Sequence, residues 1–294
     1  MKKNSQNQEE KKIFKIIKLF KKNKINDNWC CEFGAWDGVH LSNSFFLIKE
    51  LNYKAILIEP NKKKYRQLLK NHPNTEIVKL NLEVNFANNT LNKIFSKTQI
   101  PRNFDFLSID VDGNDYHFFK ELNYEPKLVC CEFTETIPND VLFVQNRVPG
   151  LSQGCSALSL ISMAKKKKYS LIDIEGGNLF FLQNKYLNLL GLKEKILKDL
   201  RNDENIKNYF YVLPDAKIIL TKPKVKILWH DNFILDFTKK IQIFPKFLQK
   251  HSTTYNFYEK ITYLFYLMLY DFSTFKKKIK RFIKNINKLN RRIK

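Results

Sequence analysis

The sequence predicts an α/β protein built on a doubly wound, mostly parallel sheet. Three observations carry this prediction: five short apolar runs have the character of buried strands, stretches with helical spacing separate them, and a glycine turn follows the first run. Strands that are apolar throughout must be covered on both faces, as in a parallel sheet with helices on either side. At 294 residues the chain can hold one such domain and an extension.

The predicted elements follow one another along the chain. An amphipathic helix is expected over residues 11–22, where Ile13, Ile16, Ile17 and Phe20 share one face, and we expect it to pack at the edge of the sheet. The strands of the parallel sheet are expected at 29–33 with a glycine turn to Gly38, and at 54–60, 76–80, 104–113 and 127–133. The helices between and after them are expected at 42–51, 61–71, 114–122 and 157–167.

Two further strands are expected at Tyr169–Ile174 and Asn178–Leu182, separated only by Glu175, Gly176 and Gly177. A connection this short cannot cross over a sheet, so these strands must form an antiparallel hairpin. The hairpin adds a reversed strand at the end of the sheet.

The distribution of glycine marks a domain boundary near residue 184. All eight glycines lie at or before Gly191, and none occurs after it. We therefore expect an N-terminal helical segment (1–28), an α/β domain (29–183) and a basic, mainly helical extension (184–294). A short strand pair is expected within the extension, at Lys217–Leu220 and Val225–Trp229.

The chain is strongly basic, with a net charge of +23. This charge fits an anionic partner such as nucleic acid, a phospholipid surface or an acidic glycan, and it equally fits lysine-rich solvated faces. Ten Lys or Arg and no acidic residue lie between residues 272 and 294, where apolar side chains share one helical face. This last helix is expected either to cap the domain or to lie on an anionic membrane.

Cysteine usage and the ends of the chain indicate a cytoplasmic protein, with peripheral membrane contact left open. The cysteines fall as adjacent pairs at 30–31 and 130–131 and singly at Cys155. Neighbours on a strand point to opposite faces, so these are expected to be reduced core residues and not zinc ligands. Lys15 and Lys18 interrupt the N-terminal apolar run, so no signal peptide is expected, and Ile261–Tyr270 is too short to span a bilayer.

Carboxylates follow four of the five predicted parallel strands. In a doubly wound sheet, ligands bind outside the carboxyl ends of the strands, so acidic residues at these positions favour a ligand site over a structural role. The residues concerned are Glu32 and Asp37, Glu59, Asp110 and Asp112, and Glu132.

The acidic rim narrows the class of ligand. A dinucleotide would rest its pyrophosphate on the glycine turn, where Asp37 would repel it. S-adenosylmethionine has no phosphate, but it has a ribose diol, an ammonium and a sulfonium, which hydrogen-bond acceptors serve well. Glu59, 25 residues after Gly34, is placed to accept both ribose hydroxyls, and Glu32 or Asp37 could serve the ammonium.

At residues 29–183 the sequence resembles the class I S-adenosylmethionine-dependent methyltransferases, which have a Rossmann-like fold, and among them the FkbM-type family. The resemblance lies in the Glu-x-Gly-x-x-x-Gly turn, the acidic end of the second strand, and the segments 106–113 (FLSIDVDG), 129–133 (VCCEF), 154–160 (GCSALSL) and 168–172 (KYSLI). It implies that the cofactor contacts Glu32, Gly34, Ala35, Gly38 and Glu59, with Asp110 beside its methionyl end. The pair Trp36-Asp37 departs from the family's usual small residue before the second glycine, which leaves the contact near the ammonium open.

Methyl transfer requires an aligned nucleophile that loses its proton, so a general base is sought at the same edge. Asp110, Asp112 and His117 are the candidates, although His117 is also a typical packing or surface histidine. Asp110, Asp112 and Glu132 could instead hold a divalent ion, but we favour a reaction without a metal.

The sequence thus predicts a methyltransferase acting on a hydroxyl of a sugar or glycan precursor, as the FkbM resemblance implies. The basic excess leaves an RNA methyltransferase as an alternative, although no aromatic platform for base stacking stands out. A non-catalytic binding module, docked by its basic tail, is the third hypothesis. Loop 134–156 and the C-terminal part are expected to build the acceptor pocket.

Overall fold

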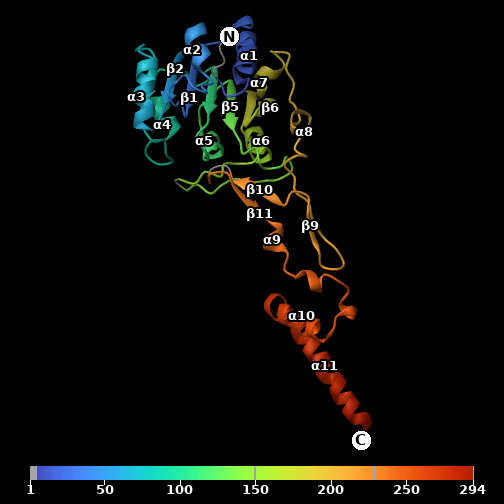
Figure 1. Cartoon of the computed structure of the whole chain (residues 1–294). Helices are drawn as coiled ribbons and strands as arrows, with labels where there is room; N and C mark the ends of the chain where they lie inside the picture. Colours follow the sequence, from blue (N-terminus) through green and yellow to red (C-terminus); the bar gives the residue numbers. More distant parts are fainter. Residues whose placement is uncertain (1–4, 149, 228–229, 294) are drawn as a thin grey trace. The chain divides into compact units, whose positions relative to one another are not determined.

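Figure 1 shows the computed structural model of the chain, which describes residues 5–148, 150–227 and 230–293. For residues 238, 239 and 285–293 it describes the backbone alone. The chain forms two compact units, Met1–Ile206 and Lys207–Lys294, which are described separately below.

The first unit is the predicted α/β domain. Its strands are β1 (Trp29–Phe33), β2 (Lys54–Ile58), β3 (Val78–Leu80), β4 (Phe106–Ile109), β5 (Leu128–Glu132), β6 (Tyr169–Glu175) and β7 (Asn178–Gln183). Its helices are α1 (Glu9–Lys22), α2 (Phe45–Leu51), α3 (Lys62–Asn71), α4 (Leu91–Ser96), α5 (Asp115–Glu121), α6 (Ala157–Lys166), α7 (Asn184–Leu187) and α8 (Leu197–Leu200). Every strand expected from the sequence in this unit is present, and α4 was not expected.

The seven strands form one sheet in the order β3-β2-β1-β4-β5-β7-β6. β1 pairs in parallel with β2 and β4, and β5 pairs in parallel with β4. The predicted hairpin is confirmed: β7 runs antiparallel to both β5 and β6, so the reversed strand lies between them and β6 forms the edge. The carboxyl ends of β1, β2, β4 and β5 therefore meet at one edge of the sheet.

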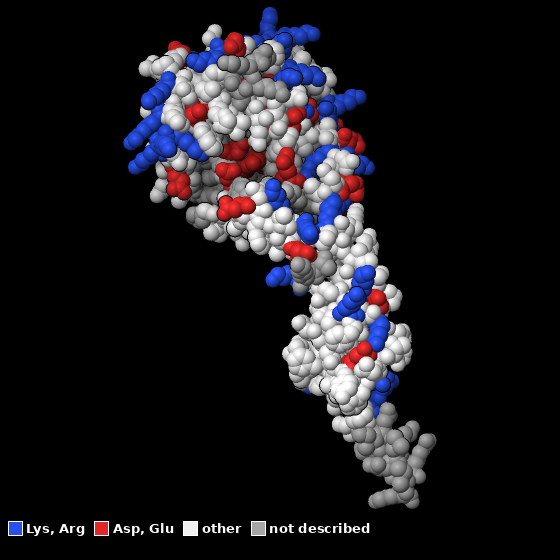
Figure 2. Space-filling model, in the orientation of Figure 1, with Lys and Arg blue, Asp and Glu red and all other residues white. Residues whose placement is uncertain are grey.

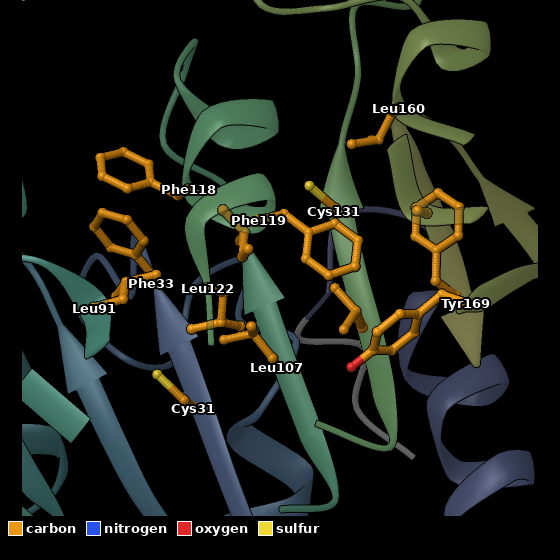
Figure 3. Close-up of a cluster of buried hydrophobic side chains, with 14 of the residues drawn as sticks. Cys31, Phe33, Leu91, Leu107, Phe118, Phe119, Leu122, Cys131, Leu160 and Tyr169 are labelled. Carbon is orange, nitrogen blue, oxygen red and sulfur yellow. The ribbon is translucent and has the colours of Figure 1, made fainter. Parts of the chain in front are cut away.

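Helices cover both faces of the sheet, as the continuously apolar strands require. One face packs against α4, α5, α6 and α8, and Figure 3 shows part of this core, where aromatic side chains such as Phe33, Phe118 and Phe119 meet. The rings of Phe33 and Phe118 are 4.9 Å apart. The other face packs against α1, α2, α3 and α7.

The position of α1 corrects an expectation, because this helix packs on a face of the sheet and not at its edge. Ile13, Ile17 and Phe20 have no exposed surface and belong to the same apolar cluster as Phe106 of β4 and Cys130 of β5. The crossovers through α2 and α3 cover the sheet on the side of β2 and β3. The α1 helix covers the remaining apolar surface of the central strands.

The adjacent cysteines lie on opposite faces of the sheet, as the strand geometry predicts. Cys30 and Cys130 belong to the cluster under α1, whereas Cys31 and Cys131 belong to the other, together with Cys155. All five are free thiols, and burial raises the pKa of each. They behave as small apolar core residues.

Residues 184–206, which the sequence assigned to the extension, pack with the first unit. Leu190 and Leu197 are buried in its two cores, and the backbone N–H of Lys195 donates to the carbonyl of Leu171 on the edge strand, at 2.8 Å. The structural division therefore lies at residue 206. The glycine count missed it because this segment contains a single glycine, Gly191, and is held by apolar contacts with the two cores.

The second unit contains hairpins as well as helices. Its elements are β8 (Phe210–Val212), β9 (Ile218–Leu220), β10 (Lys224–Ile227), β11 (Phe233–Asp236), α9 (Thr238–Ile241), the short 3-10 turns η1 (Lys246–Leu248) and η2 (Ser252–Thr254), α10 (Phe257–Tyr270) and α11 (Phe272–Ile293). Both expected strands exist, but they do not pair with each other: β9 pairs with β8, and β10 with β11. Asp231 and Asn232, both at positive φ, close the second hairpin locally. Trp229, the expected end of its strand, lies outside the described residues.

The opposite, amino-terminal edge of the sheet in the first unit is held by a buried ion cluster. The Nζ of Lys127 lies 2.7 Å from a carboxylate oxygen of Asp27 and 2.8 Å from one of Asp105. The hydroxyl of Tyr53 donates to Asp105 at 2.8 Å. Lys127 and Asp105 are almost completely buried, so the charges depend on one another.

We expect Lys127→Met to lower the free energy of unfolding by about 3–5 kcal/mol, because it leaves two carboxylates without a cation in a buried position. The control is Lys185→Met, which removes a partly exposed pair to Glu125 at 3.8 Å and should change stability by less than about 1 kcal/mol. Urea unfolding measures both. Equal effects of the two substitutions would show that the cluster is not a structural element.

Candidate functional site

The candidate site lies at the carboxyl edge of the parallel strands. The strand order places β4 between β1 and β5, so the three strand ends lie side by side. Glu32 belongs to β1, Glu59 follows β2, Asp110 and Asp112 follow β4, and Glu132 ends β5. Figure 2 shows a face of the first unit on which acidic side chains gather near the middle.

A close backbone approach fixes the turn after β1. Gly34 has φ +93°, and a Cβ atom built on it would lie 1.8 Å from the carbonyl oxygen of Asp110. The N–H groups of Gly34 and Ala35 both donate to the carbonyl of Ile58 at the end of β2. The turn is therefore fixed between β2 and β4, and only glycine fits the first position.

Glu32 holds the segment that leads into α2. One of its oxygens accepts from the hydroxyls of Ser42 and Ser44, each at 2.6 Å, and the other accepts from the N–H of Asn43 at 2.7 Å. Burial raises the pKa of this carboxyl, while the serine hydrogen bonds act in the opposite direction. Its contact with a cofactor stays a prediction, since these three donors come from the protein itself.

Asn43, in the same segment, offers a buried acceptor. Its Nδ2 donates to the hydroxyl of Ser108 on β4 at 3.1 Å, and the residue is 4 % exposed. Its Oδ1 atom has no hydrogen-bond partner among the described residues. A buried amide oxygen without a donor is unfavourable, so a ligand that donates here would be stabilised. Asn43 could not be predicted as a site residue from the sequence, because a single Asn forms no recognisable binding motif.

Asp37 is used within the turn. Its Oδ1 accepts from the N–H groups of Val39 and His40, at 2.9 and 2.7 Å. Gly38 packs against His72 at the end of α3, whose Nε2 donates to the Gly38 carbonyl at 2.8 Å, and a Cβ on Gly38 would meet this ring at 2.6 Å. The helix α2 begins only at Phe45, so the second glycine serves the contact with α3 and not the packing of the helix that follows it.

Glu59 joins the turn to the second strand. Its carboxylate accepts from the N–H of Trp36 at 2.9 Å and from the N–H of Asn61 at 2.7 Å, and it is 6 % exposed. Each oxygen retains a second lone pair for another donor. Trp36 has φ +50° and an exposed ring under the ammonium of Lys64, 3.1 Å from the ring centre.

Asp110, Asp112 and Glu132 come together, with one oxygen of each within 4.8 Å of the others. Burial, and then the neighbouring Asp112, raises the pKa of Asp110 to about 6. Burial and the nearby aspartates raise the pKa of Glu132 to about 10, and a hydrogen bond joins Glu132 to Asp110. At neutral pH Glu132 therefore carries the proton and donates it to a largely ionised Asp110. Three carboxylates at this spacing could also hold a hard divalent cation.

Asp115, the first residue of α5, supports this cluster and was missed by the sequence analysis. Its two oxygens accept from the N–H groups of Val111 and Gly113, both at 2.9 Å. Burial, together with the nearby Asp110, raises the pKa of Asp115 to about 7. These bonds hold the loop in which Asp112 has φ +55°. The available signal was an acidic residue in the first turn of a helix after a strand.

His117 packs in an aromatic group and anchors a loop. Its Nε2 donates to the carbonyl of Gln145 at 2.9 Å, and its ring lies 6.1 Å from that of Phe86. Gln145 in turn accepts from the N–H groups of Gln153 and Gly154 through its Oε1. His117 thus fastens loop 134–156 to α5, and its role as a base stays a prediction.

The N-terminal segment contributes a further carboxylate to this edge. Ser5 forms a bridge to Leu41, in the loop after β1, and Glu9 lies 3.5 Å from the Nδ2 of Asn178 at the start of β7. Glu9 has no exposed surface, and its charge adds to the rise in the pKa of Asp110. Glu9 could not be predicted as part of this edge, since it lies far along the chain from the other acidic residues.

Comparison with known proteins gives likenesses of structure only. No family model matches the chain, and no curated protein matches it in sequence.

The similar solved structures include three methyltransferases. TrmK of M. capricolum, in complex with S-adenosyl-homocysteine, is 15% identical with a TM-score of 0.35, covering 57% of this chain and 68% of its own. Magnesium protoporphyrin IX methyltransferase of Synechocystis is 10% identical with a TM-score of 0.38, covering 59% and 82%. An O-methyltransferase from Bacillus cereus is 11% identical with a TM-score of 0.35, covering 60% and 91%. At such values the likenesses do not assign an activity, which must come from the residues of the site.

We expect Gly34→Ala to destabilise the first unit by about 2–4 kcal/mol, because the added methyl meets the Asp110 carbonyl in a backbone conformation that alanine rarely adopts. The matched control is Gly191→Ala. Gly191 also has positive φ, +64°, but a Cβ there meets nothing within 4 Å, so only the conformational strain remains. Thermal unfolding of both variants separates the two effects. If Gly191→Ala were as destabilising as Gly34→Ala, the close approach would not be the constraint.

We expect the acidic cluster to make stability fall as pH rises. Folding raises the pKa of Asp110 and Glu132, so the folded state binds more protons than the unfolded state above about pH 4, and stability decreases from there toward pH 10. Glu132→Gln keeps a donor for Asp110 without an ionisable proton. It should therefore be more stable than the wild type at pH 8, by on the order of 1–3 kcal/mol, and equal to it near pH 4.

Chemical unfolding across this pH range measures the difference. A Glu132→Gln curve parallel to that of the wild type at every pH would contradict the shared proton. Stabilisation of the wild type by millimolar Mg²⁺, abolished by Asp112→Asn, would instead assign the cluster to a divalent cation.

Proposed function

We propose that this protein is an S-adenosylmethionine-dependent methyltransferase that methylates a hydroxyl of a sugar or glycan precursor. One observation carries the choice of cofactor. The protein's own carboxylates already occupy the N–H groups of the glycine turn, since Asp37 accepts from residues 39 and 40 and Glu59 accepts from Trp36. These are the groups that would bind a pyrophosphate, so a phosphate-free cofactor is favoured.

The groups at this edge fit such a cofactor. Glu59 has lone pairs left for the two ribose hydroxyls, and the Oδ1 of Asn43 is a buried acceptor in want of a donor such as an ammonium. Gly34 and Ala35 expose no bulky side chain at the turn. Glu32 would affect cofactor binding indirectly, because it orients the segment 42–44. Asp37 would affect it by holding the shape of the turn.

S-adenosylmethionine supplies, when bound, a methyl group on a positively charged sulfur. The acceptor hydroxyl must lose a proton as it attacks, and a base works best when its pKa lies near the working pH. Asp110, with a pKa of about 6 and a hydrogen bond from protonated Glu132, is the best placed base. Asp112 is exposed beside it and is the second candidate. His117 is less suited, because its Nε2 donates to the carbonyl of Gln145 and its Nδ1, the nitrogen left to accept a proton, is buried.

The charge of the edge and the family resemblance support the proposed acceptor. The negative charge that Glu59, Asp110 and Asp112 bring to this edge repels a polyanion, which disfavours RNA as the substrate despite the net charge of +23. A neutral hydroxyl compound is compatible with it. Loop 134–156, fastened by Gln145 and bearing an exposed Leu142, lies next to β4 and β5 and would form the acceptor pocket.

We expect the wild type to bind S-adenosylmethionine and its demethylated product in calorimetry, and Glu59→Gln to bind at least about tenfold more weakly. Losing hydrogen bonds to a charged acceptor corresponds to about 1.5–3 kcal/mol. Glu76→Gln, an exposed glutamate, is the control and should bind normally. A folded wild-type protein that binds neither ligand would refute the proposed cofactor.

The acceptor is tested with methyl-labelled S-adenosylmethionine, offered with neutral oligosaccharides, nucleotide sugars and RNA in parallel. Label found in the saccharide fraction supports the proposal. Label found only in RNA overturns the sugar acceptor but keeps the cofactor. Binding without any transfer would favour the non-catalytic module.

A further inference from the structure

The second unit exposes a continuous apolar stripe along α10. Seven apolar side chains of this helix are between 41% and 78% exposed, and at 100° per residue six of them fall within an arc of about 120°. The six are Phe257, Tyr258, Ile261, Phe265, Met268 and Leu269, and Tyr270 lies outside the arc. Figure 2 shows that uncharged side chains form most of the visible surface of this unit. Isolated exposed apolar residues are ordinary, but a contiguous stripe marks an interaction surface.

The opposite face of α10 is fixed to its own unit, so the stripe points outward by construction. Tyr263 and Tyr266 pack on Phe244, with ring centres 5.8 and 5.6 Å apart, and Leu267 is buried. The helix begins with a capping box between Asn256 and Glu259. Since these contacts occupy one side of the helix, rotation that would bury the stripe would break them.

The next helix, α11, supplies positive charge next to α10. Phe272 at its start is 53% exposed, and the helix is amphipathic, with Phe282 and Ile283 exposed. Its sequence has ten Lys or Arg and no acidic residue between 272 and 294. The side chains of Ile286 and Leu289, expected on the same apolar face, lie outside the described residues. α11 contacts α10, and the ammonium of Lys276 lies 4.6 Å above the exposed ring of Phe272.

We propose that α10 and α11 form a docking surface for an anionic phospholipid membrane, on which both helices lie in the interfacial plane. Aromatic and aliphatic side chains with flanking lysines are the composition of interfacial helices, in which the apolar face enters the acyl boundary and the lysines meet anionic headgroups. In the part of the chain that the structure describes, no helix is long and apolar enough to cross a bilayer. The helices therefore lie on the membrane and do not span it.

Two other occupants fit the surface less well. A second copy of the chain would bring two sets of lysines together, since a two-fold interface places the same patch on both sides. Nucleic acid would pair with the lysines of α11 but would leave the apolar stripe of α10 in water. An anionic membrane can bury the apolar stripe and also pair its headgroups with the lysines. This inference is independent of the proposed methyl transfer.

The test is co-sedimentation of the full chain with vesicles of phosphatidylcholine alone or mixed with phosphatidylserine. We expect the wild type to bind the mixed vesicles at least tenfold more tightly than vesicles of phosphatidylcholine alone. The stripe variant Ile261→Ser/Phe265→Ser/Leu269→Ser should lose at least tenfold in binding to them. The charge variant Lys276→Gln/Lys277→Gln/Lys280→Gln should lose the preference for phosphatidylserine.

Matched controls come from exposed residues of the first unit. Leu69→Ser/Leu142→Ser/Leu189→Ser and Lys62→Gln/Lys63→Gln/Lys70→Gln replace three exposed apolar side chains and three exposed lysines elsewhere, and both variants should bind as the wild type does. Phe265→Trp keeps a large aromatic side chain in the stripe and allows membrane insertion to be measured by tryptophan fluorescence. Its additional fluorescence should shift to the blue with mixed vesicles and should be quenched by brominated acyl chains.

Three results would overturn the proposal. The first is no binding of the wild type to mixed vesicles. The second is a stripe variant that binds like the wild type, with no blue shift for Phe265→Trp, since this would leave charge alone as the attraction. The third is evidence for another occupant of the surface. Such evidence would be a stable dimer in sedimentation velocity that the stripe substitutions dissociate, or tight, salt-dependent RNA binding by a protein that does not bind vesicles.

Discussion

The approach of two backbones at Gly34 and Asp110 is the constraint on which the site depends. A Cβ at position 34 would lie 1.8 Å from the carbonyl of Asp110, so the exits of β1 and β4 can meet only because a glycine stands there. This contact sets the turn beside the acidic loop after β4. Hydrogen bonds from Gly34 and Ala35 to Ile58 then bring the end of β2 to the same place. One residue without a side chain thus aligns three strand ends.

Carboxylates at this edge divide into two groups by what they bind. Glu32, Asp37 and Asp115 accept hydrogen bonds from N–H and O–H groups of the protein and define the loops. Asp110 and Glu132 bind each other and share a proton, because burial and mutual repulsion prevent both from ionising. Glu59 belongs to both groups, since it holds the turn and still has lone pairs to offer. The acidic rim is therefore partly scaffold and partly reactive surface.

The two units carry different kinds of surface. The first unit buries its apolar side chains in two cores on either side of one sheet and places its carboxylates at the strand ends. The second unit has small hairpins and leaves the apolar stripe of α10 uncovered beside a basic helix. The first has the chemistry expected of a ligand site, and the second that expected of a docking surface.

The sequence alone determined the parallel sheet, the hairpin and the acidic strand ends, because continuous apolar runs, a three-residue connection and residues at strand exits are local features. Which strands pair, and which face of the sheet a helix covers, depend on contacts between residues far apart in the sequence. The sequence therefore could not place α1 on the face of the sheet, pair β9 with β8, or join residues 184–206 to the first unit. The same holds for the site. The position of Glu59 at a strand end could be predicted from the sequence. The positions of Glu9, Asn43 and Asp115 could not, because their hydrogen bonds and charge interactions form between groups that are far apart along the chain and meet only in the folded structure.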